Sequence, residues 1–141
     1  MIVDANKLIA AFLKDGLIRR IIILGGIRLY TIEQVLEEMD EHKDELLRKA
    51  GIDERVYELI LRDILLPHIT VVEGRWVMDV ADEARGIAGS FDPDDWPVIA
   101  LALKLGAPIW TNDRKIVEAS RSTGRFRAIT THELLKMLSE L

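Results

Sequence analysis

The sequence predicts an α/β protein built on a parallel sheet, and three observations support this fold class. Short, mostly apolar stretches alternate along the chain with longer segments of helical periodicity. Glycine, proline and helix-capping residues separate most of these segments. Strands that alternate with helices pair in parallel through right-handed crossovers. We therefore expect one domain over residues 1–141, a length that suffices for a full core.

Five short stretches have the composition of buried strands, and turn residues flank them. The predicted strands cover residues 1–4, 27–31, 69–72, 107–110 and 126–130. Because the strands are parallel, their carboxyl ends should meet at one edge of the sheet, where ligand sites of such folds lie.

The segments between the strands carry apolar residues at helical spacing. After the second strand, Val35 and Met39 belong to such a stripe, and Thr31 is the expected N-cap of that helix. The segment that begins at Thr131 is expected to cap the last helix. The predicted helices cover residues 6–14, 17–24, 32–50, 53–66, 76–87, 96–105, 116–122 and 134–141.

Composition and charge exclude several classes of protein. The chain has no cysteine, which rules out disulfides and thiolate metal sites and fits a reducing, cytoplasmic location. Asp4 interrupts the first apolar run, so we expect no cleavable signal, and no run is long enough to span a membrane. A net charge of −5 argues against a generic basic nucleic-acid binder. It does not exclude a nuclease, because clustered acids that hold a cation contribute to that charge.

Four acidic residues are predicted to converge at the carboxyl edge of the sheet. Asp4 ends the first strand, and Asp113 follows the fourth. Asp95 begins a helix that returns antiparallel to the strands, so the start of that helix lies at the same edge. Glu38 lies on the border of the apolar stripe of its helix, from which its side chain can reach over the sheet.

Carboxylates that share a pocket repel one another, and some of them bind protons unless a cation neutralises them. Mg²⁺ and Mn²⁺ prefer carboxylate oxygens and water as ligands. Such an ion activates a bound water, and a pair of ions also holds the leaving oxygen of a phosphodiester. The pattern therefore indicates metal-dependent hydrolysis without a nucleophilic Ser or Cys.

Each acid also has an ordinary structural interpretation. Asp95 and Asp113 can cap the helices that follow them, and Asp92 before proline fits a turn. Glu38 can belong to a solvated charged flank. The conjunction of these acids with Asp4 at the end of the first strand favours a site.

Four segments resemble the motifs of the PIN-domain nucleases, in that family's order and over nearly the whole chain. Residues 3–9 have an acid at a strand end, then Asn and an apolar helix. Residues 31–39 contain two adjacent glutamates, of which the second is the ligand in the family. Residues 92–103, an acidic run that leads into an Ala-rich helix, give the most specific match. Residues 111–113 resemble the fourth motif.

This resemblance implies a three-layer α/β/α sandwich with a central parallel sheet and a metal-dependent ribonuclease site. The implied catalytic and metal-binding quartet, with Mg²⁺ or Mn²⁺ as cofactor, is Asp4, Glu38, Asp95 and Asp113. The implied auxiliary residues are Asn6, Asp92, Asp94 and Thr111. The chain departs from the family pattern at Lys115, where many members carry a further acid, and at Ile32, where many have proline.

An RNA substrate, single-stranded or structured, must also be held by its phosphates. The basic residues that we expect near the site or on the first helices are Lys7, Lys14, Arg19, Arg20, Arg114 and Lys115. Each can equally be a solvated surface charge. The resemblance further implies a homodimer and, because many relatives are VapC-type toxins, a small antitoxin protein as partner.

The main alternative is an RNA-binding PIN module that keeps the acids but turns over poorly. A haloacid-dehalogenase-type phosphatase would need a second aspartate where this chain has Asn6. A receiver domain would need an acidic pair near the first strand and a central phosphorylatable aspartate. A nucleotide-binding fold is disfavoured because no Walker or GxGxxG motif occurs.

Overall fold

The computed structural model describes residues 1–13 and 16–140. These residues form a five-stranded, all-parallel sheet of order β3-β2-β1-β4-β5, which confirms the predicted fold class. The strands are β1 (Ile2–Val3), β2 (Leu29–Ile32), β3 (Ile69–Val72), β4 (Ile109–Trp110) and β5 (Ala128–Ile129). The central strand, β1, pairs with β2 on one side and with β4 on the other.

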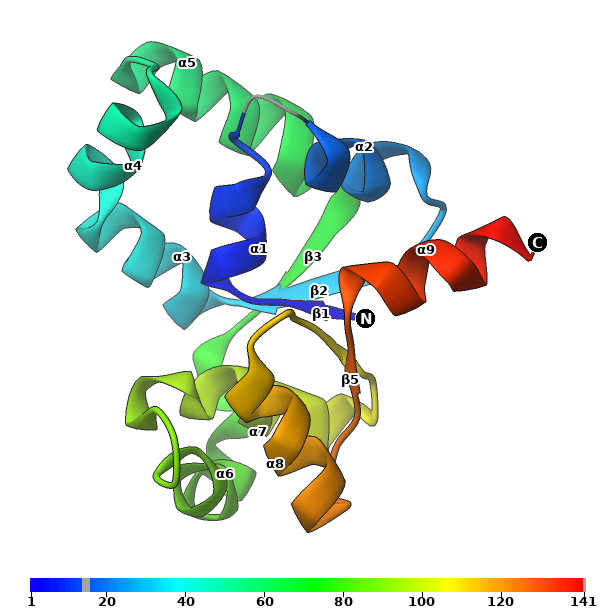
Figure 1. The fold of residues 1–141 in the computed structure, drawn as a ribbon. Helices are drawn as coiled ribbons and strands as arrows, with labels where there is room; N and C mark the ends of the chain where they lie inside the picture. The colour runs from blue at the N-terminus through cyan, green and yellow to red at the C-terminus, as the bar shows by residue number, and fades with distance from the viewer. Residues whose placement is uncertain (14–15, 141) are drawn as a thin grey trace.

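Helices cover both faces of this sheet and produce the three-layer sandwich (Figure 1). On one face lie α1 (Ala5–Ala10), α2 (Leu17–Leu24), α3 (Glu33–Glu41), α4 (Lys43–Ala50) and α5 (Glu54–Glu58). On the other lie α6 (Ala81–Ala88), α7 (Trp96–Leu105) and α8 (Arg114–Thr123). The last helix, α9 (Thr131–Ser139), begins beside α1, where the side chains of Lys7 and Thr131 are in contact.

The direction of the chain across the sheet explains which face each helix covers. The chain steps from β1 to β2 to β3 in one direction, and then from β4 to β5 in the other. Right-handed crossovers in opposite directions place their helices on opposite faces. The reversal lies between β1 and β4, and a ligand crevice is expected beyond the carboxyl ends of strands at such a point.

Helix α7 is apolar except for Lys104 in its last turn, as suits a helix that other elements enclose on several sides. It packs against β1 and β2 and also against α6 and the 3-10 helix η3 (Gly74–Val80). All its residues from Pro97 to Ala102 are buried. The sheet and the core therefore fix the start of α7, where Asp95 lies.

Several predicted helices differ from those of the structure. The helix predicted over residues 32–50 is divided at His42 into α3 and α4. Thr31 is not its cap, because Thr31 is still part of β2 and its buried hydroxyl donates to the Val3 carbonyl at 2.8 Å. Ile32 occupies the N-cap position of α3 and forms no side-chain cap bond.

The single helix predicted over residues 53–66 is three elements in the structure. The α-helix α5 is followed by a π-helix, η1 (Leu59–Leu65), and then by a 3-10 turn, η2 (Leu66–His68). The helix predicted from residue 76 begins as η3 before α6. Another 3-10 turn, η4 (Pro93–Asp95), precedes α7.

The last helix has Thr130 rather than Thr131 as its cap. The Thr130 and Glu133 side chains form a reciprocal capping box. The end of the first predicted helix at residue 14, and residue 141 of the last, lie outside the described residues. Within the part of the chain that is described, no helix is both long and apolar enough to cross a membrane.

Candidate functional site

A crevice lies at the carboxyl edge of the sheet, between α3 and the segment that leads into α7. Its cavity volume of about 30 Å³ is enough for an ion or a few water molecules. The lining residues are Asp4, Ala5, Asn6, Gln34, Val35, Glu38, Asp94, Asp95, Pro97 and Val98. Three of the four predicted ligands thus line one crevice, and so do the auxiliary candidates Asn6 and Asp94.

Asp4 follows β1 and is buried, with only 6% of its surface exposed. Its Oδ1 accepts a hydrogen bond from the Lys7 backbone N–H at 3.0 Å, which caps α1. Burial raises the pKa of the Asp4 carboxyl, and the charge of Asp113 raises it further, whereas the Lys7 N–H bond and ammonium oppose the shift. Asp113 therefore lies close enough to Asp4 to affect the protonation of the Asp4 carboxyl.

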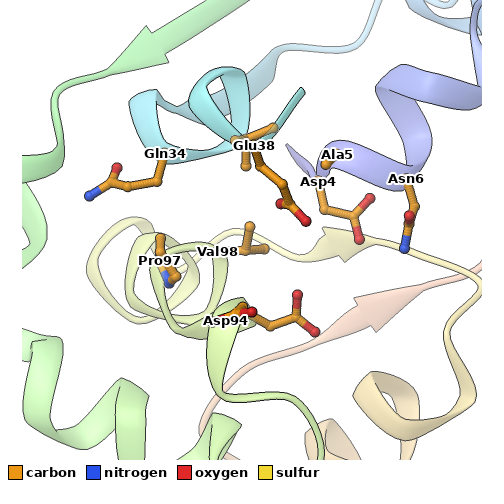
Figure 2. A pocket seen from close by; sticks show the side chains of 10 residues that line it. Asp4, Ala5, Asn6, Gln34, Glu38, Asp94, Pro97 and Val98 are labelled. Carbon is orange, nitrogen blue, oxygen red and sulfur yellow. The ribbon is translucent and has the colours of Figure 1, made fainter. Parts of the chain in front are cut away.

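Glu38 lies in the last turn of α3, opposite the segment that carries Asp94. Figure 2 shows the Glu38 and Asp4 side chains directed toward the same space, with Asn6 beside Asp4. Partial desolvation raises the pKa of Glu38, and the charges of Asp4, Asp92 and Asp94 act in the same direction. His42, one turn further along the chain, opposes this shift.

Asp95, which precedes α7, also has a perturbed carboxyl. Burial raises its pKa to about 7, with further contributions from the charges of Asp92, Asp4, Asp113 and Glu38. Although Asp95 occupies the N-cap position of α7, its side chain makes no cap hydrogen bond. The capping interpretation therefore does not account for this carboxylate, which is half-buried and has no bond to the helix that it begins.

The structural interpretation does hold for Asp92 and Asp113. The Asp92 carboxylate accepts from the Asp94 N–H at 3.0 Å within η4. Asp113 caps α8 by accepting from the Lys115 N–H at 2.9 Å, and its own N–H donates to the Thr111 hydroxyl at 3.0 Å. Thr111 is buried, so this bond fixes the connection between β4 and α8. Asp113 does not line the crevice, but it contributes to the electrostatic field on Asp4 and Asp95.

The chemistry of these donors fits a divalent cation. All four predicted ligands are carboxylates, and burial and mutual repulsion favour the protonated form of Asp95 up to about pH 7. A hard cation such as Mg²⁺ or Mn²⁺ reverses that balance and selects oxygen ligands. Across residues 1–13 and 16–140, however, no three Asp, Glu or His side chains converge closely enough to hold an ion.

The basic residues predicted to bind RNA lie in very different surroundings. Lys7 is buried, with its ammonium bonded to Thr131, and Lys14 lies outside the described residues. Arg19 donates to the Ala11 carbonyl at 2.8 Å, and the exposed Arg20 is also on α2, which leads into the amino end of β2. Arg114 and Lys115 are exposed in the first turn of α8, directly after Asp113. Among those of these basic residues that the structure describes, only Arg114 and Lys115 combine exposure with a position beside a predicted ligand.

Sequence reasoning missed two residues near the site. Gln34 lines the crevice one helical turn before Glu38, and the i, i+4 spacing could have identified it. The side-chain amide oxygen of Gln34 is buried without a hydrogen-bond partner. Thr131 accepts hydrogen bonds from Lys7 and from Trp110, and no local pattern in the sequence indicates such long-range contacts.

Together, these features describe a parallel α/β protein with an acid-lined crevice at the edge of its sheet. A family model for the PIN domain matches residues 2–135, and the chain belongs to the PIN domain family. PIN domains are generally nucleases, which act as hydrolases. Among curated proteins, none matches the chain significantly.

Proposed function

We propose that this protein is a metal-dependent endoribonuclease that hydrolyses RNA phosphodiester bonds. The observation that carries the proposal is the crevice at the carboxyl edge of the sheet, which Asp4, Glu38 and Asp95 line together. Burial and the neighbouring acids raise the pKa of Asp95 in this crevice to about 7. Perturbed acids of this kind in a crevice are typical of functional sites. PIN family membership and the oxygen-only ligand set support the same conclusion.

Asp4, Glu38, Asp95 and Asp113 would hold one or two Mg²⁺ or Mn²⁺ ions. When bound, such an ion lowers the pKa of a coordinated water and neutralises charge on the phosphate. The protein's contribution is to keep Asp4 in place through the Lys7 N–H and Asp113 through the start of α8. Asn6 beside Asp4 offers an amide to the phosphate or to water, and Arg114 and Lys115 offer positive charge to the flanking RNA.

A binding module that turns over poorly is the second candidate. It is favoured by the separation of the acids, since no three of the described Asp, Glu and His side chains converge on one ion. A homodimer, an antitoxin partner, a cytoplasmic location and a single-domain chain are further proposals, which follow from the sequence patterns and the family resemblance.

The test is cleavage of a generic single-stranded RNA with Mn²⁺ and with EDTA. It compares the native protein with Asp4→Asn and Asp95→Asn, and with Asp63→Asn, an exposed acid on η1, as the matched control. We expect metal-dependent cleavage that the first two substitutions abolish and the control leaves unchanged. No cleavage of several RNAs by a folded, Mn²⁺-loaded protein would favour the binding module.

A further inference from the structure

The Lys7 side chain places a buried ammonium beside the acidic crevice. Only 6% of Lys7 is exposed, and its Nζ donates to the Thr131 hydroxyl at 3.0 Å. The same ammonium lies 5.4 Å from the centroid of the Trp110 ring. A buried charge requires a hydrogen-bond acceptor, and Thr131, 124 residues away in sequence, provides it.

Thr131 connects three segments of the site. Its hydroxyl also accepts from the Trp110 indole N–H at 3.0 Å, which occupies the second of its two acceptor lone pairs. Its backbone N–H donates to the Asn112 side chain at 3.0 Å. Thr131 thereby joins α1, which follows Asp4, to the end of β4 and to the connection that carries Asp113.

The Lys7 ammonium and a divalent cation are alternative partners for the Asp4 carboxylate. The charges of Lys7 and Asp4 influence each other, and the Lys7 backbone N–H already binds Asp4 Oδ1. Both residues belong to the described part of the chain, and their side chains nevertheless form no ion pair within 4.0 Å. If the ammonium lost its acceptor, the nearby carboxylate would be its natural partner, and this pairing would oppose cation binding.

We propose that Thr131 is a positioning residue of the metal site. Its hydroxyl holds the Lys7 ammonium away from Asp4 and so leaves that carboxylate available to a divalent cation. This role rests on the proposed function, since it concerns the same acidic crevice. It assigns a function in the site to the first residue of α9, which none of the four acidic motifs contains.

The experiment measures Mn²⁺ binding to the full chain from the electron paramagnetic resonance signal of free Mn²⁺. The variants are Thr131→Val, which removes the hydroxyl at nearly constant shape, Thr131→Ser, which keeps it, Lys7→Met, and the double variant Lys7→Met/Thr131→Val. We expect Thr131→Val to raise the Kd about tenfold, a typical effect of losing a group that supports metal ligands. We expect the other three variants to bind close to the native value.

The double variant separates positioning from a general structural effect. Rescue of Mn²⁺ binding by Lys7→Met in the Thr131→Val background would support the proposal, because removing the ammonium cannot repair a misfolded helix. If Thr131→Val and the double variant bind Mn²⁺ equally weakly, the proposal is overturned. It is also overturned if Thr131→Val binds Mn²⁺ as tightly as the native protein. Circular dichroism melts check that each variant is folded. Should Thr131→Val fail to fold, Thr131→Ala, which also removes the hydroxyl, replaces it: weaker Mn²⁺ binding that Lys7→Met restores supports the role, and native-strength binding overturns it.

Failure of the proposed function gives a different result. Native protein that binds no Mn²⁺ and cleaves no RNA would overturn both the proposed function and this role. Native protein that binds Mn²⁺ and loses that binding on Asp95→Asn, but not on Thr131→Val, would overturn the role of Thr131 alone.

Discussion

Asp95→Asn should stabilise the metal-free protein at alkaline pH. The pKa of Asp95 is raised from 3.8 to about 7 in the folded protein, so the folded state binds this proton more tightly than the unfolded state. Stability therefore falls as the pH rises from about 4 to about 7, and above that range the whole penalty is present. Asn, which has no charge, does not carry this penalty.

The structure gives a magnitude for this effect. Raising the pKa of Asp95 from 3.8 to about 7 corresponds to about 4 kcal/mol, because one pKa unit is worth about 1.4 kcal/mol. Asp95 is only half-buried, and solvent screening reduces the figure to about 2 kcal/mol. We therefore expect Asp95→Asn to exceed the native protein by about 2 kcal/mol in free energy of unfolding at pH 8, and by nearly nothing at pH 4.

The assay is urea denaturation in EDTA at several pH values between 4 and 8. Asp63→Asn serves as the matched control, because Asp63 is an exposed acid on η1, and its stability should follow the native curve. A difference between Asp95→Asn and native protein that does not change with pH would refute the reasoning. So would a variant that is less stable than native protein at pH 8.

Three further predictions concern the cation, the fold and the RNA. Mn²⁺ at 100 times its Kd should add about 2.7 kcal/mol to the free energy of unfolding, measured by urea denaturation, and Asp95→Asn should abolish this gain. Gly74→Ala should lower stability by about 1 kcal/mol, because the added Cβ would press on the side-chain amide of Gln34, with Nε2 its nearest atom and Oε1 at 2.9 Å. Gly86→Ala, with no atom within 4 Å of the added Cβ, should raise stability by about 0.5 kcal/mol in the same assay. Arg114→Ala and Lys115→Ala should each weaken RNA binding. Each should also reduce the slope of the logarithm of the binding constant against the logarithm of the salt concentration by about 0.7, whereas an unchanged slope would exclude a phosphate contact.

The sheet and the position of the acids were predictable because both depend on local patterns. Apolar stretches marked all five strands, and the parallel connection rule placed the strand-end acids at one edge. The continuous helix over residues 32–50 was wrong because its apolar stripe continues past His42, where the backbone leaves helical geometry. The cap at Thr31 was wrong because the pairing with β3 extends β2 through this residue.

The surroundings of Lys7 could not be predicted from the sequence. A lysine three residues after a site acid has the pattern of a phosphate ligand, whereas the structure encloses it between Trp110 and Thr131. That enclosure depends on how β4 and α9 pack against α1, and no local pattern encodes this packing. The carboxylates of Asp92 and Asp113 accept backbone hydrogen bonds at the helix starts, whereas the Asp95 carboxylate makes no such bond. This difference likewise follows from the backbone geometry there, which no local pattern in the sequence indicates.

The central place of β1 in the sheet has a consequence for folding. This strand pairs with β4, where Ile2 lies beside Ile109 and Val3 beside Trp110, so its partners are more than one hundred positions away in the sequence. Contacts of such long range close large loops and slow the search for the native state. During synthesis, the acids near the start of the chain therefore stay apart from Asp113 until β4 and the connection that follows it have been made. The acidic crevice, which is lined from both α1 and the start of α7, cannot form until the segment through Val98 has been made.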